Sequence, residues 1–539
     1  MVFSAAFESL DTAQCFEGTR VDVLDQLRQW IDDEDTSPPV FWINGSAGTG
    51  KTTLAHTFAA ECKSRGIPVT SFFCSRDFAE RSNPNLIFTS IAHHLSQTFP
   101  SFGVQLAAVL QLNPHLVSAS IPYQLEELII KPLRSTRDSF RLCLIVIDAL
   151  DECKEAGSTG TTSVILSSLS RYVSEVSPLK ILVTSRPEQS ITSAFAPRSG
   201  HLNAASQRLF LHELELGVVQ EDIKHYLSSA LRDIGAFYRL SYSWPSEKDI
   251  HLLATLSSGL FIFAATSIKF IKERNDSDPR GQLIRLLTGN YSSANACSSP
   301  YHHLDALYTQ VLKHAFPDIS TQLSGRLKMI LGSIVSLQEP LSPVSLEDLL
   351  GLTPSAVQET LVHLGSILIL PENDSQLPVI RLHHPSFVDF ITDVNRCSDA
   401  RYIVNSEKQH TLLAVRCLEA MQSLKQDICG IKNPCILNSE VDGLSSYIAE
   451  NILPHIQYAC RYWMFHITHA LVSDTLVKLL KEFCTKYLLY WIEVCSLLGE
   501  LQNALVGVHA VKEFLLVCGM CLEFCKGLML NYFTEKELG

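Results

Sequence analysis

Short apolar runs alternate with amphipathic stretches from residue 40 to residue 215, and this alternation predicts strands interleaved with helices. Leu54, Phe58 and Cys62 recur four residues apart after the first apolar run and predict a helix that ends near Gly66. The runs are nearly continuous, which is typical of strands in a parallel sheet that helices cover on both faces. The predicted strands are Val40–Asn44, Leu142–Leu150, residues 180–187 up to the proline, and Leu209–Leu211.

The pattern becomes helical after residue 216. Residues 274–300 are rich in loop-forming residues, so we expect a domain boundary there. Three helices and two strands around a Pro/Asn/Asp turn then predict a winged-helix outline, and residues 396–539 have a helical period. The four residues that share the first helical face are Ile223, Tyr226, Leu227 and Leu231; the later helices are Met329–Ser336, Ser345–Leu350 and Ala356–Leu364, and the strands are Ile367–Leu370 and Val379–Leu382.

The segment between the first predicted strand and its helix fits the pattern G-x-x-x-x-G-K-[ST]. It reads Gly45-Ser46-Ala47-Gly48-Thr49-Gly50-Lys51-Thr52, and Thr53 continues the helix. Glycines let backbone N–H groups close around a phosphate, and the helix N-terminus adds partial positive charge. Lys51 would reach the β- and γ-phosphates, and the Thr52 hydroxyl would coordinate Mg²⁺. The sequence therefore predicts a site for a nucleotide with Mg²⁺ over residues 45–53.

Acidic residues end the second predicted strand. Ligands of parallel sheets bind beyond the carboxyl ends of the strands, so Asp148 is the candidate carboxylate on the Mg²⁺ side. Asp151 or Glu152 could polarise an attacking water. A core strand followed by a solvated acidic loop is the alternative.

The third predicted strand ends on Arg186. If this strand neighbours the Asp148 strand, Arg186 emerges on the phosphate side and can stabilise γ-phosphate charge. The other interpretation is that Arg186 is a surface arginine at the end of a strand that Pro187 terminates.

Composition and charge limit the classes of binding partner that we expect for this protein. The chain has 539 residues and a net charge of −13, with 43 Lys+Arg against 56 Asp+Glu, and we find no basic tract. This balance argues against nucleic acid as the main partner. The N-terminus lacks the features of a secretory signal, and the most apolar run, Phe514–Leu530, is interrupted by Glu523 and Lys526. We therefore expect no membrane partner and a cytoplasmic location.

The sixteen cysteines are interpreted as reduced thiols, mostly small core residues. Cys518, Cys521 and Cys525 have a spacing that could supply three metal ligands. The same spacing places them on one buried stripe of a helix, and a fourth ligand is not evident.

Three motifs, GSAGTGKT, IVIDALDEC and LVTSRP, resemble in order and spacing the NACHT-type P-loop NTPases of the signal-transduction (STAND) class. The resemblance is to the large fungal set whose P-loop domain is also described as nephrocystin-3-like, proteins associated with innate immunity. The lead-in Cys15–Arg20, followed by an amphipathic stretch to Trp30, and the segment Ser71–Arg76 are similar to that set as well. The resemblance covers most of residues 15–465.

The resemblance implies roles for single residues. Lys51 and Thr52 would hold phosphate and Mg²⁺, Asp148 would be the metal-side acid, and Glu152 the catalytic acid/base. Arg186 would be the first sensor of the γ-phosphate. His384, within a segment similar to the family's H-x-S-F-x-D-F signature, would contact the β-phosphate of ADP, although a histidine after a strand is often only a structural hydrogen-bonder.

Phe261 stands where related NTPases often carry a proline that contacts adenine, so the resemblance leaves the adenine contact open at this position. The alternative interpretation of this segment is a plain apolar helix that packs on the lid. The family's members are switches, closed with ADP at rest and oligomeric with ATP when triggered, and slow hydrolysis resets them. Expected ligands are thus ATP/ADP (or GTP/GDP) and Mg²⁺, and expected protein partners are further copies of the chain or related NACHT proteins.

We therefore predict an α/β P-loop NTPase domain, with a parallel sheet and helices on both faces, followed by a helical lid, a winged helix and an all-α C-terminal region. The expected bounds are 1–36 for the lead-in helix and linker, 37–215 for the P-loop core, 216–275 for the lid, 276–395 for the winged helix and 396–539 for the C-terminal arm. No sensor repeat and no N-terminal effector are recognised in the sequence. A nucleotide-holding module or decoy without turnover is therefore the alternative to a slow NTPase switch.

Overall fold

The computed structural model describes residues 14–33, 36–76, 78–136, 142–153, 160–173, 178–272, 278–288, 301–317, 319–371, 379–432 and 436–517. The chain forms two compact units, each treated separately below. The first comprises Met1–Gln310 with the short segment His384–Ser386, and the second comprises Val311–His383 with Phe387–Gly539.

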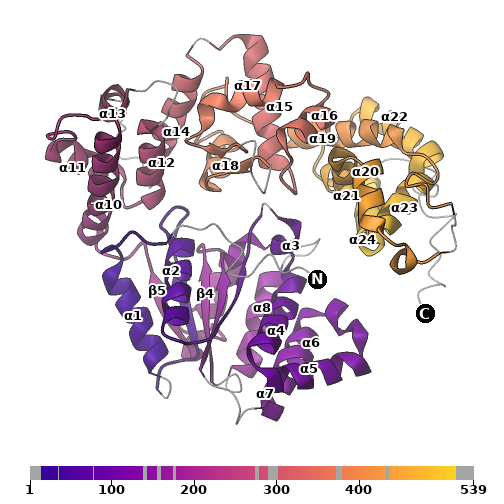
Figure 1. Cartoon of the computed structure of the whole chain (residues 1–539), viewed down its shortest axis with the longest axis horizontal. Coiled ribbons are helices and arrows are strands. Elements are labelled where there is room, and N and C mark those ends of the chain that lie inside the picture. Colours follow the sequence, from indigo (N-terminus) through magenta and orange to yellow (C-terminus); the bar gives the residue numbers. More distant parts are fainter. Residues whose placement is uncertain are drawn as a thin grey trace. The chain divides into compact units, whose positions relative to one another are not determined.

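A five-stranded parallel sheet forms the centre of the first unit (Figure 1). Its spatial order is β2-β3-β4-β1-β5, so β4 lies between β1 and β3. Ile181 of β4 pairs with Val40 on one side and with Ile145 on the other. Three neighbouring strands thus end at the same edge of the sheet, where the site residues were predicted. The strands are β1 (Val40–Asn44), β2 (Val69–Phe73), β3 (Cys143–Asp148), β4 (Leu179–Ser185) and β5 (Ser206–Phe210).

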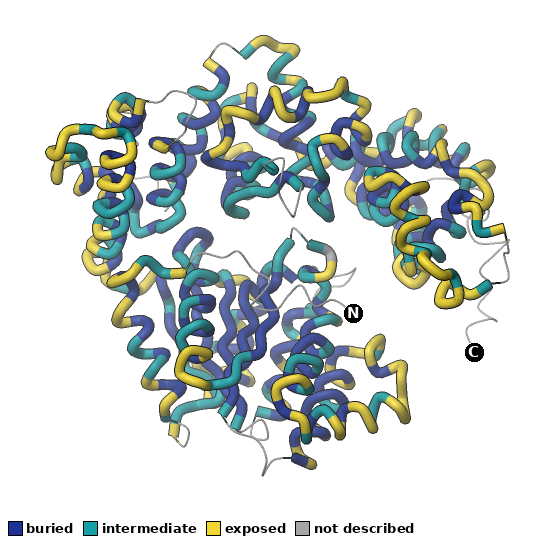
Figure 2. The backbone as a smooth tube through the Cα atoms, in the orientation of Figure 1, coloured by how far each residue is buried: buried dark blue, intermediate teal, exposed yellow. Residues whose placement is uncertain are grey.

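Helices cover both faces of this sheet, as the apolar runs predicted. Alternate residues of β1 point to opposite faces, with Phe41 and Ile43 in one buried cluster and Val40 and Trp42 in the other. On the first face lie α1 (Val21–Asp32) and α2 (Lys51–Ser64), and α2 buries the predicted stripe Leu54, Phe58 and Cys62. Figure 2 shows the central strands as buried, and β1, β3 and β4 are buried at every residue, whereas β5 is mostly half-buried.

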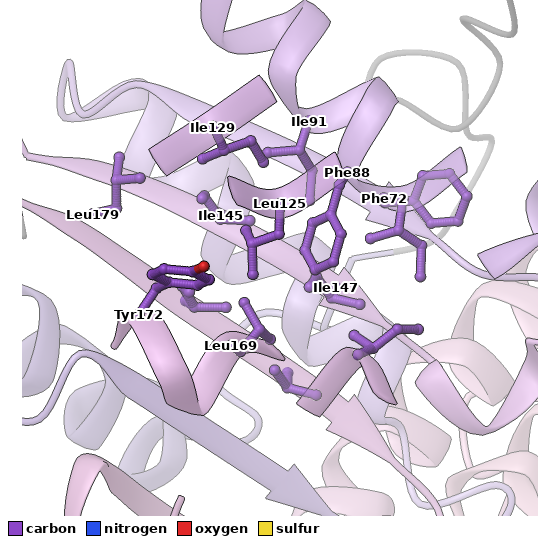
Figure 3. Close-up of a cluster of buried hydrophobic side chains, with 14 of the residues drawn as sticks. Phe72, Phe88, Ile91, Leu125, Ile129, Ile145, Ile147, Leu169, Tyr172 and Leu179 are labelled. Atoms are coloured by element: carbon purple, nitrogen blue, oxygen red, sulfur yellow. The ribbon is translucent and has the colours of Figure 1, made fainter. Parts of the chain in front are cut away.

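The opposite face carries a larger cluster, part of which is drawn in Figure 3. Phe72, Ile145 and Ile147 of the sheet pack there with Phe88 and with Leu169. Each such side chain removed from water contributes roughly 1.5–3 kcal/mol. The helices on this side are α3 (Ala79–Ser82), α4 (Ile87–Thr98), α5 (Pro100–Leu112), α6 (Ile121–Gln124), the π-helical turn η4 (Leu125–Ile130), α7 (Lys131–Thr136), α8 (Thr161–Tyr172) and α9 (Gln189–Thr192).

A group of helices follows the sheet, as predicted. The face of α10 (Leu216–Phe237) buries Ile223, Leu227 and Leu231, while Tyr226 is half-buried. Ser246 and Asp249 form a capping box at the start of α11, with reciprocal side-chain to backbone hydrogen bonds. The remaining helices before residue 320 are α11 (Glu247–Leu256), α12 (Phe261–Ile271), α13 (Pro279–Thr288) and α14 (His302–Ala315).

The second unit is mainly helical. It contains the three predicted helices and the predicted strand pair, which is antiparallel; residues 372–378 of the expected turn lie outside the described residues. A buried aromatic core joins Trp463 to Trp491, whose indole Nε1 donates to the Cys460 carbonyl at 2.9 Å. The elements are α15 (Thr321–Ser336), α16 (Pro343–Leu350), α17 (Ala356–Leu361), β6 (Leu368–Ile369), β7 (Arg381–Leu382), α18 (Ser386–Ile391), α19 (Ser406–Ala420), α20 (Leu444–Asn451), α21 (Pro454–Thr468), α22 (Asp474–Glu482), the π-helical turn η12 (Phe483–Tyr487), α23 (Leu488–Leu497) and α24 (Leu501–Val517).

In the part of the chain that the structure describes, none of the helices combines the length and the apolar character needed to cross a membrane.

Candidate functional site

The predicted phosphate loop connects the end of β1 to the start of α2. Gly48 and Gly50 have φ angles of +80° and +91°, a backbone conformation that residues with a Cβ rarely adopt. A Cβ on Gly45 would lie 2.7 Å from Thr49 Oγ1, and Thr49 in turn donates to the Ser46 carbonyl at 2.8 Å. The glycines of the motif are therefore required by the shape of the loop itself.

The start of α2 offers a group of backbone donors. Gly50 is the N-cap and supplies no side chain, and the first helical bond runs from Leu54 N to the Gly50 carbonyl at 2.9 Å. The N–H groups of Lys51, Thr52 and Thr53 therefore belong to the first turn, where helices bind anions. One loop amide, Ala47 N, donates to the Tyr301 hydroxyl at 3.2 Å.

Lys51 lies along the inside of the loop. Its Nζ donates to the carbonyls of Gly45 at 2.7 Å and Ser46 at 3.1 Å. Burial lowers the pKa of Lys51, and the nearby carboxylates, with Asp151 foremost, act in the opposite direction. The ammonium group is thus held by neutral acceptors in a site surrounded by acidic residues.

Asp148 lies at the carboxyl end of β3, beside the start of α2. The Thr184 hydroxyl donates to Asp148 Oδ1 at 2.6 Å. Burial raises the pKa of Asp148, while the hydroxyls of Thr184 and Thr52 and the charge of Lys51 lower it, which places Thr52 close to this carboxyl group. A hydroxyl and a carboxylate close together are oxygen donors of the kind that Mg²⁺ prefers.

Asp151 and Arg186 form a pair at the edge where β3 and β4 end. Asp151 Oδ1 accepts from Arg186 N at 2.9 Å, and its Oδ2 lies 3.2 Å from Arg186 Nε. Arg76, just after β2, places Nη2 4.0 Å from Asp151 Oδ2 and donates its backbone N–H to Glu152 Oε2 at 3.4 Å. Arg186 follows β4, and β4 pairs with β3, the strand that ends on Asp148, so the structure decides a question that the sequence left open.

Helix α12 contacts the loop through its first turn. Ile262 N donates to the Gly48 carbonyl at 3.2 Å. Amides in the first turn of a helix have no acceptor within the helix, and the phosphate loop supplies one here. The side chain of Ile262 also covers Gly48, because a Cβ there would lie 2.1 Å from Ile262 Cγ2. Phe261 occupies the first helical position, where proline is favoured, and its ring faces the Arg20 guanidinium at 4.7 Å.

Arg20 is a site residue to which the sequence analysis assigned no role. Its Nη2 donates to the Thr49 carbonyl at 2.9 Å, and its backbone N–H donates to Asp222 Oδ2 of α10 at 3.0 Å. The side chain is buried, and burial lowers its pKa. Arg20 therefore links the segment before α1 to the phosphate loop, to α10 and to Phe261. The lead-in motif that ends on Arg20 was the available signal.

His384 is half-buried and belongs to the first unit. Its Nδ1 accepts from Ser386 N at 3.0 Å and lies 2.7 Å from Ser386 Oγ, which contacts the Tyr308 hydroxyl at 2.8 Å. Burial, with the positive charges of Lys51, Arg186 and Lys269, lowers the pKa of His384 to about 3. The ring is therefore neutral at physiological pH, and since Nδ1 accepts, Nε2 carries the proton.

The Cε1 edge of this ring faces the phosphate loop. Cε1, which is bonded to both ring nitrogens, lies 3.9 Å from the position of a Cβ on Gly48. Thus a neutral N–H donor from residue 384 is close to the loop.

A comparison with family models finds one match in this part of the chain. Residues 18–186 match the family described as Nephrocystin 3, N-terminal. The match begins before Arg20, includes the phosphate loop and the acidic strand, and ends at Arg186. It spans 169 of the 539 residues, counted from 18 through 186. A search of curated proteins finds no match.

Several solved structures are similar at low identity. One is a STAND protein with a tetratricopeptide repeat sensor from Pyrococcus horikoshii, 13% identical, with a TM-score of 0.38 and coverage of 96% of this chain and 67% of that one. The ORC2 protein of Aeropyrum pernix is 13% identical, with a TM-score of 0.33 and coverage of 69% and 91%. AMPPCP-bound DnaA from Aquifex aeolicus is 16% identical, with a TM-score of 0.29 and coverage of 59% and 84%. These identities are too low for a function to be transferred.

The predicted site residues from three strands and one helix start thus come together at one edge of the sheet. Lys51, Thr52, Asp148 and Arg186 are mutually close, as the electrostatic effects on Lys51 and Asp148 also indicate. The cysteines at 518, 521 and 525 lie outside the described residues.

Proposed function

We propose that this protein is a nucleotide-binding switch of the NACHT/STAND class that binds ATP, or GTP, with Mg²⁺ and hydrolyses it slowly. The observation that carries the proposal is the glycine-formed loop that holds the Lys51 ammonium at the start of α2, next to Asp148 at the end of β3. This arrangement places the Thr52 hydroxyl and the Asp148 carboxylate beside the loop. Few functions other than phosphate and metal binding use that combination.

The site residues would have different roles in this function, according to where each one lies. Backbone N–H groups at the start of α2 would bind the phosphates, and Lys51 would exchange its carbonyl partners for phosphate oxygens. Mg²⁺, held through Thr52 and Asp148, would neutralise charge that develops on the transferred phosphoryl group. Arg186, fixed by Asp151, would stabilise the same charge from the β4 side.

We assign the water-activating role to Glu152 and a positioning role to Asp151. Asp151 is buried and engages both the backbone N–H and the side chain of Arg186. A carboxylate held in this way is poorly placed to accept a proton from water. Glu152 is half-buried, and its contact with Arg76 N is long at 3.4 Å.

His384 supports a nucleotide-dependent conformational change. A neutral Nε2–H donor close to the phosphate loop suits a hydrogen bond to a β-phosphate, the contact that the family resemblance implies. We propose that this bond favours a closed state with ADP, and that the state with ATP associates with further copies or with related proteins.

A titration with a fluorescent nucleotide tests the binding step. Lys51→Ala should weaken affinity at least a hundredfold, because the variant loses the cation that faces the phosphates. Lys63→Ala is the matched control, since Lys63 is exposed in the last turn of the same helix and should leave affinity unchanged. Equal affinities for the two variants would refute the phosphate-site assignment.

A nucleotide-holding module without turnover is the second candidate. It is favoured by the fact that both acids after β3 already have hydrogen-bond donors, Arg186 on Asp151 and the backbone N–H of Arg76 on Glu152. Single-turnover measurement of phosphate release separates the two. Bound triphosphate that persists over many hours in the wild-type chain would support this second candidate.

A further inference from the structure

Two cysteines lie against each other next to the candidate catalytic acids. Cys74 follows β2 directly, and Cys153 follows the acidic turn η6 (Leu150–Glu152). Their sulfur atoms are 3.2 Å apart, both residues are buried, and both are reduced. The mechanism proposed above uses neither thiol.

The two segments that carry these thiols are already held together by several contacts. Cys74 N donates to the Asp148 carbonyl at 3.0 Å, so the first residue after β2 extends the pairing with β3. Two residues later, Arg76 contacts both Asp151 and Glu152. These contacts keep the two segments, and therefore the two sulfur atoms, near each other.

We propose that Cys74 and Cys153 form a reversible disulfide that acts as a redox-sensitive lock on the acidic turn. A disulfide has an S–S bond of about 2.05 Å, so the sulfurs must approach by about 1.1 Å from their separation of 3.2 Å. Because the strand pairing holds Cys74, most of this movement would fall on Cys153 and on the adjoining Glu152.

A hydroperoxide is the oxidant that we name for this reaction. One thiol attacks hydrogen peroxide to give a sulfenic acid and water; the second thiol then attacks the sulfenic sulfur, which forms the S–S bond and releases a second water. In total, two thiols lose two hydrogens and one peroxide becomes two waters. A dithiol reductant reverses the reaction by thiol–disulfide exchange. Burial raises the pKa of Cys74, so we expect a slow reaction at neutral pH.

The expected effect on the site rests on the proposed function. A displacement of about 1 Å in a catalytic group can cost roughly a hundredfold in rate, so the cross-linked protein should hydrolyse nucleotide about ten- to a hundredfold more slowly. Nucleotide affinity should change less than about twofold, because Lys51 and the loop glycines lie on the β1 side, away from the cross-link. Oxidising conditions would thus prolong the triphosphate-bound state.

Intact mass and peptide mapping of the full chain test the disulfide itself. After mild peroxide treatment and alkylation, the protein should show the loss of two hydrogens and one cross-linked peptide pair containing Cys74 and Cys153. The cross-link closes a loop of 79 residues (153 minus 74) and should raise the melting temperature by about 5 °C or more. Both changes should disappear on reduction.

Cys74→Ser and Cys153→Ser should each lose the cross-link and the peroxide-dependent rise in melting temperature. Cys62→Ser is the matched control, because Cys62 is buried in the same unit and should leave both effects intact. Oxidation of the wild-type chain without this peptide pair, or an unchanged melting temperature, would overturn the proposal.

Hydrolysis is then compared within each variant, with and without peroxide. A cross-linked protein with unaltered turnover would show that the disulfide does not regulate the site. A reduced protein that binds no nucleotide would instead refute the proposed function, while mass and melting temperature would still decide whether the disulfide forms.

Discussion

Substitution of Gly48 by alanine tests the contact between the phosphate loop and helix α12. The new Cβ would have two separate effects. The φ angle of +80° is unfavourable for alanine, and the Cβ would lie 2.1 Å from Ile262 Cγ2. Ile262 cannot easily rotate away, because β-branched side chains in helices have one strongly preferred rotamer.

The two effects have different magnitudes. A left-handed conformation costs a residue with a Cβ about 1–2 kcal/mol. Overpacking costs typically 1–3 kcal/mol. Gly48→Ala should therefore destabilise the first unit by about 2–5 kcal/mol, which corresponds to a fall in melting temperature of roughly 4–10 °C for a unit of this size.

Gly50→Ala is the matched control. Gly50 has a similar φ of +91°, but no atom lies within 4 Å of the position of its Cβ. This variant should therefore show the conformational cost alone, about 1–2 kcal/mol. The difference between the two variants measures the steric contact with α12.

A double-mutant cycle with Ile262→Ala completes the test. Truncation of Ile262 removes Cγ2 but leaves its Cβ 3.0 Å from the new Cβ, so Gly48→Ala in that background should cost less than in the wild type but still more than Gly50→Ala does. A coupling of about 1–3 kcal/mol is expected from thermal melts of the four proteins. If Gly48→Ala is no less stable than Gly50→Ala, or if the cycle shows no coupling, the loop does not contact α12 as described.

Four further outcomes are expected. Glu152→Gln should keep nucleotide affinity and slow phosphate release at least a hundredfold, because a general base is removed; if only Asp151→Asn has this effect, the two roles are reversed. His384→Ala should weaken ADP binding about ten- to a hundredfold more than ATP binding, because a hydrogen bond to a charged group contributes roughly 1.5–3 kcal/mol. The same variant should form larger assemblies in size-exclusion chromatography. The folded pKa of His384 is about 3, below the unfolded value of 6.5, so the unfolded chain gains the proton first as pH falls. The stability that depends on a neutral His384 is therefore present above pH 6.5 and is lost as the pH falls towards 3. The difference in melting temperature between wild type and His384→Ala should shrink between pH 7 and pH 5. A constant difference would contradict the assigned protonation. Arg20→Lys should lower the melting temperature by several degrees, because lysine cannot both reach the Thr49 carbonyl and cover Phe261 with a planar cation; an unchanged melt would show that this contact is not stabilising.

Four of the five strands of the sheet and the phosphate loop could be predicted because their signals are local; β2 (Val69–Phe73) was not among the predicted strands. Residues 40–64 contain a buried strand, a glycine-rich loop and a helix with apolar residues every fourth position, and the structure has β1 and α2 there. The acidic strand was equally clear, since an apolar run ends on Asp148. These patterns depend on neighbours within one or two helical turns, which a single sequence displays.

The order of the strands could not be predicted in the same way. Spacing left open whether the strand before Arg186 lies next to the Asp148 strand. The structure places β4 between β1 and β3, and this position brings Thr184 into hydrogen-bonding contact with Asp148. Thr184 had no local signal of its own, because a threonine near the end of a strand is common.

The contacts around Arg20 were missed for a similar reason. Its partners Thr49, Asp222 and Phe261 lie 29, 202 and 241 residues further along the chain. Cys74 and Cys153 are separated by 79 residues, and their proximity follows from the pairing of β2 with β3. Such contacts are determined by packing of the whole unit, and a pattern read along the chain does not contain them.

The charges at the site explain why binding of an anionic ligand to the phosphate loop would be favourable. Lys51 is buried, and its ammonium group donates to two carbonyls that carry only partial charge. Asp151, the acid with the largest favourable effect on Lys51, is itself paired with Arg186. A buried charge without a full countercharge is costly, and the lowered pKa of Lys51 reflects this cost. A phosphate group would supply the missing negative charge, so part of the cost of burying Lys51 would be recovered as binding free energy.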